Sequence, residues 1–228
     1  MKICFLSDTH LFLRGLQLPD ADLLVHSGDF LSWGTLAEFN REVEVINDVA
    51  NKFKHGMICT AGNHDIIIDN QPALCKSMLN SNVKMLLNEP YELEGLKFYG
   101  SPYTPKFGTG WGFQLNDVLH QKHCWDLIPD DVDILITHGA PYKILDEVLY
   151  PSPPDYDENV GDKVLLETLS RLKQLKIHTF GHLHLQGSQT KEVNGVRFIN
   201  ASTCDDEYIP HRKPIVVEIV DGVVTLLP

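Results

Sequence analysis

Short apolar segments recur along the 228-residue chain, separated by polar and glycine-containing turns. Their length and their content of β-branched side chains are typical of buried strands. We expect such strands at residues 3–6, 23–26, 57–61, 83–87, 97–99, 134–137, 178–180 and 196–199. Two further segments, 216–220 and 223–227, flank Asp221-Gly222. That dipeptide predicts a two-residue hairpin turn between them.

Two helices are predicted from apolar residues at helical spacing. The first follows Thr35 and Glu38, which form a capping-box pattern, and its apolar positions continue to Phe53. The second carries apolar residues between Val164 and Leu175. Strands and helices alternate early in the chain and strands dominate later, which predicts an α/β fold with a mixed sheet covered by helices.

No internal repeat and no linker rich in Gly, Ser or Pro divides the sequence, so we expect a single domain over residues 1–228. Two stretches, residues 101–113 and 139–161, match neither strand nor helix patterns. Loops of this length inside a domain are often functional.

Composition and charge narrow the classes of protein. The net charge is −12, from 31 acidic and 19 basic residues, so no long nucleic acid is expected as a partner. The five cysteines show no repeated spacing, and neither a signal peptide nor a membrane-spanning segment is expected. We therefore expect a reduced, cytoplasmic protein without membrane association. The sequence does not indicate an oligomeric state.

Five short polar motifs occur where an expected strand runs into a loop. In chain order they are Asp8-Thr9-His10, Gly28-Asp29, Gly62-Asn63-His64-Asp65, Thr137-His138-Gly139 and Gly181-His182-Leu183-His184. Because the carboxyl ends of strands in an α/β sheet form one rim, segments distant in sequence can meet there. Each motif alone is weak evidence, since a Gly-Asp pair is usually a turn. Together, and in this order, they predict a dinuclear metal site.

The donor atoms of these motifs are carboxylate, amide and imidazole groups, without thiolate. This set suits Mn²⁺, Fe, Zn²⁺ or Ni²⁺, and we expect two divalent ions with Mn²⁺ as the first candidate. In Asp-x-His and His-x-His the outer two side chains of an extended segment point to the same side. Glycines before Asp29, Asn63 and His182 permit tight turns and close backbone approach.

The order of these motifs resembles the calcineurin-like metallophosphoesterases. Four further segments resemble the small branch of that superfamily named for its metallophosphoesterase domain: residues 101–105 (Ser-Pro-Tyr-Thr-Pro), 110–113 (Gly-Trp-Gly-Phe), 137–141 (Thr-His-Gly-Ala-Pro) and 199–204 (Ile-Asn-Ala-Ser-Thr-Cys). The resemblance covers nearly the whole chain. It implies a four-layer αββα fold, in which two mixed sheets form a sandwich flanked by helices and the metals lie at one edge.

The resemblance also implies roles for individual residues. One metal would be held by Asp8, His10 and His184, and the other by Asn63, His138 and His182, with Asp29 bridging the two. His64 would remain unligated and face the substrate, with Asp65 orienting it. Some members of the branch lack a histidine corresponding to His10 or His184 and are weak catalysts, whereas this chain keeps both.

The expected reaction is hydrolysis of a small phosphate ester by a water activated between two metal ions. His64 would donate a proton to the departing oxygen. The resemblance suggests a phosphodiesterase acting on small nucleotides, cyclic ones included. The alternatives are a phosphomonoesterase or protein phosphatase, a nuclease, and a nucleotide-binding scaffold of low activity. The absence of an arginine from residues 30–34, after Gly28-Asp29, counts against a protein phosphatase.

Aromatic residues in the 101–113 segment, Trp111 among them, are candidates for stacking on a nucleobase, and loop packing explains them equally well. Asn63 and His64 are the other candidate substrate contacts. The six remaining histidines are interpreted as structural: His26, His55, His120, His123, His178 and His211. Asn200 is interpreted as a residue that hydrogen-bonds a turn.

Overall fold

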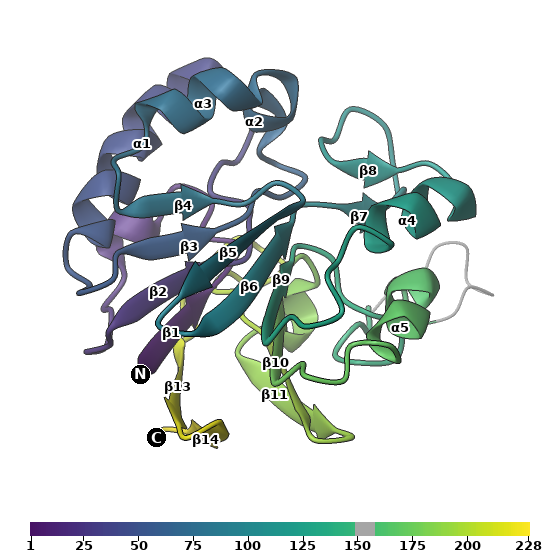
Figure 1. Ribbon diagram of the computed structural model, residues 1–228. Helices are drawn as coiled ribbons and strands as arrows, with labels where there is room; N and C mark the ends of the chain where they lie inside the picture. The colour runs from purple at the N-terminus through teal and green to yellow at the C-terminus, as the bar shows by residue number, and fades with distance from the viewer. Residues whose placement is uncertain (149–157) are drawn as a thin grey trace.

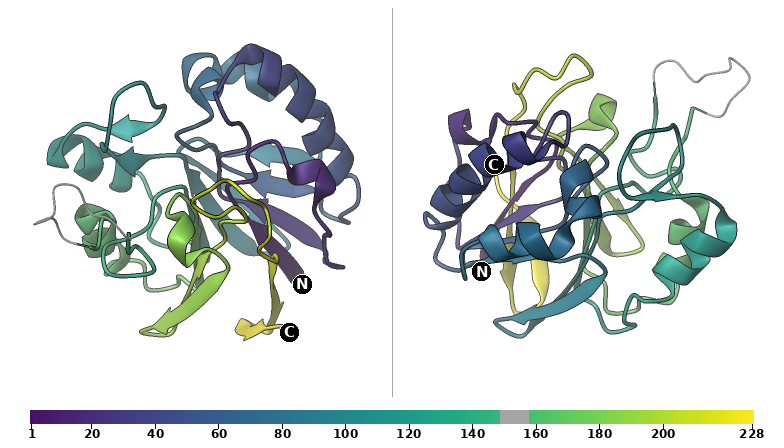
Figure 2. Two further views of the ribbon diagram at one scale, coloured as in Figure 1. Left: turned by 180° about the vertical axis from the view of Figure 1, so that it is seen from behind. Right: turned by 90° about the horizontal axis from the view of Figure 1, so that it is seen from above.

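Two six-stranded mixed sheets lie face to face in the computed structural model, and helices cover both outer faces (Figure 1). The structure describes residues 1–148 and 158–228. The predicted four-layer arrangement of helices, sheet, sheet and helices is confirmed. The view from above in Figure 2 separates α1–α3 on one side of the molecule from α4 and α5 on the other.

The first sheet has the strand order β14-β13-β1-β2-β3-β4. Its strands are β1 (Lys2–Leu6), β2 (Leu23–His26), β3 (Met57–Cys59), β4 (Val83–Met85), β13 (Ile215–Val220) and β14 (Val223–Leu226). β1 to β4 are parallel, whereas β13 pairs with β1 in the antiparallel sense. The hairpin predicted at Asp221-Gly222 joins β13 to β14, and both residues have positive φ, as a type I′ turn requires.

The second sheet has the strand order β11-β12-β10-β9-β6-β5. Its strands are β5 (Glu89–Leu93), β6 (Leu96–Ser101), β9 (Ile134–Thr137), β10 (Ile177–Phe180), β11 (Gln189–Val193) and β12 (Val196–Asn200). The four inner strands are parallel, and β5 and β11 close the edges as antiparallel partners. A small separate sheet pairs β7 (Thr104–Pro105), inside the 101–113 segment that matched no pattern, with β8 (Gln114–Leu115), which directly follows that segment.

The helices are α1 (Leu36–Ala50), α2 (Ile66–Asn70), α3 (Pro72–Met78), α4 (Val118–Trp125) and α5 (Lys163–Leu169), with short 3₁₀ turns η1 (Leu13–Gly15) and η2 (His184–Gln186). The capping box predicted at Thr35 and Glu38 is present in both directions. The Thr35 hydroxyl accepts from the Glu38 N–H at 3.2 Å, and the Glu38 carboxylate accepts from the Thr35 N–H at 3.2 Å. These bonds satisfy backbone donors that a helix start otherwise leaves unpaired.

The alternation of side chains along β1 shows how the layers form. Ile3 and Phe5 point into the apolar layer between the sheets, whereas Cys4 and Leu6 pack beneath α1–α3. The second sheet behaves alike, because Ile134 of β9 enters the layer between the sheets and Leu135 packs on the side of α4 and α5. Apolar residues at every position of a strand therefore reflect burial on both faces.

The second predicted helix is shorter than its apolar pattern suggests. α5 ends at Leu169, and the chain then turns, with the Leu172 N–H bonded to the Leu169 carbonyl. Leu172 and Leu175 are nevertheless buried, so the apolar spacing indicated burial correctly and helix length incorrectly. The Arg171 guanidinium donates to the Trp125 carbonyl, which fixes the turn against the end of α4. Among the described residues, no helix has the length and apolar character needed to cross a membrane.

Candidate metal centre

The five polar motifs converge at the edge where the parallel strands of both sheets end. From the first sheet, residues after β1, β2 and β3 supply Asp8, His10, Asp29, Asn63 and His64. From the second sheet, residues after β9 and β10 supply His138, His182 and His184. The Ser27 and Thr179 hydroxyls, 3.2 Å apart, join the two sheets just behind this edge.

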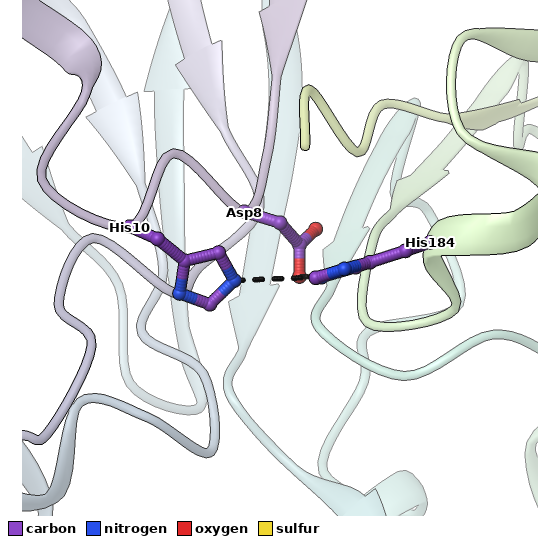
Figure 3. A group of neighbouring side chains, drawn as sticks. All are labelled: Asp8, His10 and His184. Atoms are coloured by element: carbon purple, nitrogen blue, oxygen red, sulfur yellow. Dashed lines mark hydrogen bonds and ion pairs between the residues drawn. The ribbon is translucent and has the colours of Figure 1, made fainter. Parts of the chain in front are cut away.

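Asp8, His10 and His184 form the first of three groups whose candidate ligand atoms lie within 4.8 Å of one another. In Figure 3 Asp8 and His10, from the loop after β1, and His184, from the start of η2, point toward one another. Nε2 of His184 lies 3.2 Å from Oδ1 of Asp8 and 3.4 Å from Nε2 of His10. This is a compact set of two imidazoles and one carboxylate.

The second group joins Asp8, Asp29 and His138, and the third joins His10, Asp29 and His64. Nε2 of His138 lies 2.9 Å from Oδ1 of Asn63 and 3.2 Å from Oδ2 of Asp29. The Asp29 carboxylate is thus shared by two ligand groups, one that contains His138 and one that contains His10. Asp8 and Asp29 are both completely or almost completely buried.

Four of these histidines are oriented in the same way, because a backbone carbonyl lies at Nδ1 of each ring. The pairs are His10 with Leu31 (2.9 Å), His64 with Ser32 (2.6 Å), His138 with Ser27 (2.9 Å) and His184 with Asp205 (2.8 Å). A carbonyl oxygen only accepts, so Nδ1 carries the proton and the neutral ring presents its Nε2 lone pair to the centre. Ligating histidines in metalloproteins are commonly fixed by such bonds.

This orientation tests whether the residues fit a metal. With all three rings neutral, the Nε2 lone pairs of His10 and His184 would face each other, and that of His138 would face two oxygen acceptors. Facing acceptors are unfavourable unless a positive charge lies among them. A cation satisfies all of them at once, so the donor set and its geometry fit divalent metal ions.

The pKa shifts of Asp8 and His138 also indicate that positive charge is stabilised at the centre. Burial alone raises the pKa of Asp8, but the hydrogen bond and charge of His184 outweigh it and hold that pKa well below its usual value. Burial lowers the pKa of His138, yet the Asp29 carboxylate outweighs burial and raises the pKa to about 9. Burial keeps the pKa of His10 below its usual value. In the metal-free protein, a proton on His138 thus occupies the place where a cation would bind.

The backbone at the strand ends is held in an uncommon conformation. Asp8, His10, Asp29 and His182 have positive φ, between 40° and 68°. Non-glycine residues adopt this region rarely, and such strain is concentrated at functional sites. At Gly181 a Cβ atom would lie 2.0 Å from Oδ2 of Asp8, so only glycine permits this approach of β10 to the Asp8 carboxylate.

Asp65 does not hold the His64 ring as the resemblance implied. Its carboxylate accepts the backbone N–H groups of Asp29 (2.9 Å), Leu31 (3.0 Å) and Gly62 (2.9 Å). The His64 ring is held instead by the Ser32 carbonyl. The expected role of Asp65 is therefore corrected: it fixes the backbone of the loops that carry the candidate ligands.

His182 is placed differently from the other candidate ligands. Its backbone N–H donates to both Asp8 oxygens at 3.0 Å, but its ring belongs to none of the three groups found among the described residues. The ring lies with its centroid 5.2 Å from that of His138 and 4.9 Å from that of Phe107. Burial lowers the pKa of His182 to about 3, which keeps the ring neutral.

A cavity of about 190 Å³ opens over the centre. Asp29, Asn63, His64 and His182 of the candidate centre line this cavity, together with the aromatic side chains of Phe107 and Trp111. The Trp111 and His64 rings lie 4.4 Å apart. Phe107 and Trp111 of the 101–113 segment thus adjoin the centre, whereas Tyr103 and Phe113 pack against each other with ring centroids 5.7 Å apart.

Other sequence predictions are resolved by contacts away from the centre. The buried rings of His26 and His178 each pair with a threonine hydroxyl, Thr9 at 3.1 Å and Thr137 at 2.8 Å, as structural histidines do. The Asn200 side-chain amide donates to the carbonyl of Leu183, the residue just before η2, at 2.8 Å.

Two residues of the centre escaped the sequence analysis. The Ser202 hydroxyl donates to Oδ2 of Asp8 at 2.8 Å, and the Tyr208 hydroxyl lies 3.4 Å from Nε2 of His64. Ser202 follows β12, so the strand-end argument that identified the other motifs also applies to it. Nothing in the sequence around Tyr208 marks it, because it lies in a loop several residues beyond the strand.

Comparison with known proteins gives relatives over almost the whole chain. Metallophosphoesterase domain-containing protein 1 of Homo sapiens is 34% identical over 237 residues, covering 93% of this chain and 69% of the relative. A UPF0046 protein of Caenorhabditis elegans is 31% identical over 232 residues, covering 96% of this chain and 75% of the relative.

Solved structures share the fold at low sequence identity. Phosphopantetheinyl hydrolase of Mycobacterium tuberculosis superposes with a TM-score of 0.63 at 15% identity, covering 99% of this chain and 95% of that one. A putative 5′-nucleotidase of Staphylococcus aureus gives a TM-score of 0.56 at 14% identity, covering all of this chain and 53% of that one. At these identities the likeness concerns the fold alone.

The family model described as calcineurin-like phosphoesterase matches residues 1–186, which include every motif at the candidate metal centre. The match agrees with the relatives, with the fold and with the convergence of buried histidine and aspartate side chains. The chain belongs to the calcineurin-like phosphoesterase family.

Proposed function

We propose that the protein is a two-metal phosphodiesterase that hydrolyses small nucleotides, including cyclic ones. The observation that carries the proposal is the ring orientation at the centre. Backbone carbonyls fix Nδ1 of His10, His138 and His184, so that their Nε2 atoms converge on two buried aspartates. Such a preorganised donor set is what a metal-dependent phosphoesterase needs.

We assign Asp8, His10 and His184 to one ion and Asn63, His138 and His182 to the other, with Asp29 between them. The short contacts around Asp8 and around His138 support this division. The assignment of His182 has the least support from the geometry, because its ring belongs to none of the three ligand groups. To share an ion with His138, the His182 ring would have to move closer to it. Because both sheets contribute ligands, we also propose that residues 1–228 act as one domain.

When bound, two divalent ions would lower the pKa of a shared water and offset the charge on the phosphate. The remaining chemistry falls to the side chains. His64 lines the cavity, and its Nδ1 is committed to the Ser32 carbonyl. Nε2 is therefore the atom that would carry a proton to the departing oxygen. Asn63 lies beside His64 in the cavity and would contact the phosphate.

The character of the cavity supports a diester substrate. Its lining contains the carboxylates Asp29 and Asp206 and, among the described residues, no lysine or arginine. A phosphomonoester carries a second negative charge that such a lining does not compensate beyond the metal ions. The rings of Phe107 and Trp111 offer a surface on which a nucleobase can stack.

The test is turnover of bis(p-nitrophenyl) phosphate and of p-nitrophenyl phosphate by the Mn²⁺-loaded protein, followed by a panel of cyclic and linear nucleotides. We expect the diester to be preferred. Preference for the monoester would overturn the diesterase assignment, and turnover of neither substrate would favour a nucleotide-binding scaffold. Elemental analysis should find two ions per chain, with Mn²⁺ tried first and Fe, Zn²⁺ and Ni²⁺ as the alternatives.

We further propose a cytoplasmic protein that binds small phosphate esters rather than long nucleic acids. The five cysteines are all free and buried, which agrees with a reducing compartment. The net charge of −12 disfavours binding to a polyanion.

A further inference from the structure

The loop after β12 reaches the metal centre from beyond residue 186, where the match to the family model ends. Its base is fixed to the centre, because Nδ1 of His184 donates to the Asp205 carbonyl at 2.8 Å. The Asp205 carboxylate accepts the N–H groups of Glu207 (3.0 Å) and Ile209 (2.9 Å). These bonds close the loop into a tight turn and determine where Tyr208, between the two donors, is placed.

Tyr208 lies against the candidate ligands. Its ring centroid is 4.8 Å from that of His10 and 5.4 Å from that of His184, both in edge-on arrangements. The hydroxyl lies 3.4 Å from Nε2 of His64, and the side chain lines the same cavity as His64 and Asn63. The residue remains 44% exposed, so it borders the entrance and is accessible to substrate.

The direction of the contact with His64 follows from the other end of the ring. Nδ1 of His64 lies 2.6 Å from the Ser32 carbonyl and therefore carries the proton of the neutral ring. In that ring Nε2 accepts from the Tyr208 hydroxyl, and when Nε2 carries the proton for the leaving group it donates to the same phenol oxygen, so the contact exists in both forms. The His64 ring is held at both ends, by a carbonyl behind it and by a phenol at the atom that faces the cavity.

We propose that Tyr208 is a positioning residue that acts through His64 on the leaving-group side of the site. This inference rests on the proposed function, in which Nε2 of His64 serves the departing oxygen. A ring fixed at one end can still rotate about its side-chain bonds, and a second contact at Nε2 restricts that rotation. Positioning of this kind matters most for a leaving group that departs only with a proton.

The experiment compares Tyr208→Phe with the unaltered protein, both loaded with Mn²⁺, on two diesters that differ in their leaving group. Diphenyl phosphate releases a basic phenolate, and bis(p-nitrophenyl) phosphate releases a far less basic one. Loss of a single hydrogen bond should lower kcat about tenfold for diphenyl phosphate and less than about threefold for the nitrophenyl ester, with KM little changed. Tyr91→Phe, in the edge strand β5, is the matched control and should change kcat for neither diester.

A second readout does not depend on turnover. In the metal-free protein the ¹⁵N resonance of His64 Nε2, assigned with His64→Gln, should move in Tyr208→Phe and stay in place in Tyr91→Phe. Equal losses on both diesters, no loss on either, or an unmoved Nε2 resonance would overturn the proposal. If the unaltered protein turns over no ester, the proposed function fails, and the resonance still tests the contact between Tyr208 and His64.

Discussion

At the scale of single residues, Asp29 is the side chain on which both halves of the candidate centre depend. One oxygen lies 3.2 Å from Nε2 of His138, and the other accepts the His64 N–H at 2.7 Å. The same carboxylate belongs to the groups on the His10 side and on the His138 side. We propose that ions on the His10 side and on the His138 side are held together only when the negative charge of Asp29 lies between them.

Asp29→Asn should therefore abolish binding of both ions, because the amide keeps the shape of the side chain and loses its negative charge. Elemental analysis of the purified variant measures the stoichiometry. Asp146→Asn is the control, since Asp146 is equally buried but hydrogen-bonds the backbone of Lys143 and Gly161. Retention of one ion by Asp29→Asn would contradict a bridging role.

His64→Ala should separate chemistry from metal binding. Its ring is proposed to serve the leaving oxygen and not to hold an ion, so the variant should keep both ions. Loss of a general acid typically lowers kcat by about 10²–10⁴-fold. Metal content and kcat measured on the same preparation distinguish the two roles, and loss of an ion would reassign His64 as a ligand.

Glu42 offers a pH-dependent test outside the centre. Its side chain is 4% exposed, Oε1 has no hydrogen-bond partner, and burial raises its pKa to about 7. Because the folded pKa lies above the usual value, stability is greatest below pH 4.5 for this group and is lost as pH rises through 7. Glu42→Gln should therefore raise Tm relative to the parent at pH 8 and much less at pH 5. Each kcal/mol gained in the free energy of unfolding corresponds to about 2–4 °C in Tm at this size. An equal gain at both pH values would exclude ionisation as the cause.

The residue scale is also where prediction from sequence was least complete. Ligand candidates could be identified because each directly follows a strand, and strand ends meet at one edge. The partners of Asp65 could not be predicted, because its position next to His64 in the sequence does not determine where a carboxylate in a loop points. Its actual partners are backbone N–H groups of two different loops.

At the scale of elements, β10 illustrates how closely a strand end must approach its neighbour. A Cβ atom at Gly181 would lie 2.0 Å from Oδ2 of Asp8 and 2.1 Å from Oγ of Ser7. Such contacts are far inside van der Waals distance, so the strand end or the Asp8 carboxylate would have to move. Prediction from sequence assigned this glycine a close approach but could not identify the group that it meets.

Gly181→Ala should consequently weaken binding of the ion assigned to Asp8, His10 and His184, because displacement of Asp8 disrupts that ligand set. Titration of the metal-free variant with Mn²⁺ measures the affinity. Gly15→Ala, where a Cβ atom meets nothing within 4 Å, is the matched control. Unchanged affinity in Gly181→Ala would show that the strand end relaxes without moving the carboxylate.

The elements themselves were predictable to different degrees. Buried strands and α1 follow from apolar runs, helical spacing and a capping box, all of which are local signals. The short helices α2, α3 and α4 and the edge strands β5 and β11 were not anticipated. Their burial patterns are mostly exposed or irregular, so contacts with the rest of the fold, more than periodicity, define them.

At the scale of the whole molecule, the candidate centre joins the two sheets. The ligands on β1, β2 and β3 belong to the first sheet, and those on β9 and β10 belong to the second. Behind the centre an apolar cluster packs between the sheets, and polar links such as that between Ser27 and Thr179 join them near the edge. Bound ions would therefore add a polar connection at one edge of an otherwise apolar interface.

Removal of the ions by a chelator should lower the stability of the whole fold. Binding at a concentration about 100 times Kd stabilises a protein by about 2.7 kcal/mol, which corresponds to roughly 5–10 °C in Tm at this size. Thermal unfolding with Mn²⁺ and with EDTA measures the difference. Asp29→Asn should show no such difference, and a shift that persists in that variant would place the stabilising ion elsewhere.

The position of β1 has a consequence for how the chain is made. β1 is an interior strand whose neighbours are β2, which leaves the ribosome soon afterwards, and β13, which is synthesised more than 200 residues later. During translation one edge of β1 therefore lacks its partner, and Asp8 lacks Ser202 and His184. Pairings so distant in sequence form slowly, so the centre can assemble only after nearly complete synthesis, and nascent chains expose an apolar strand edge that chaperones would shield.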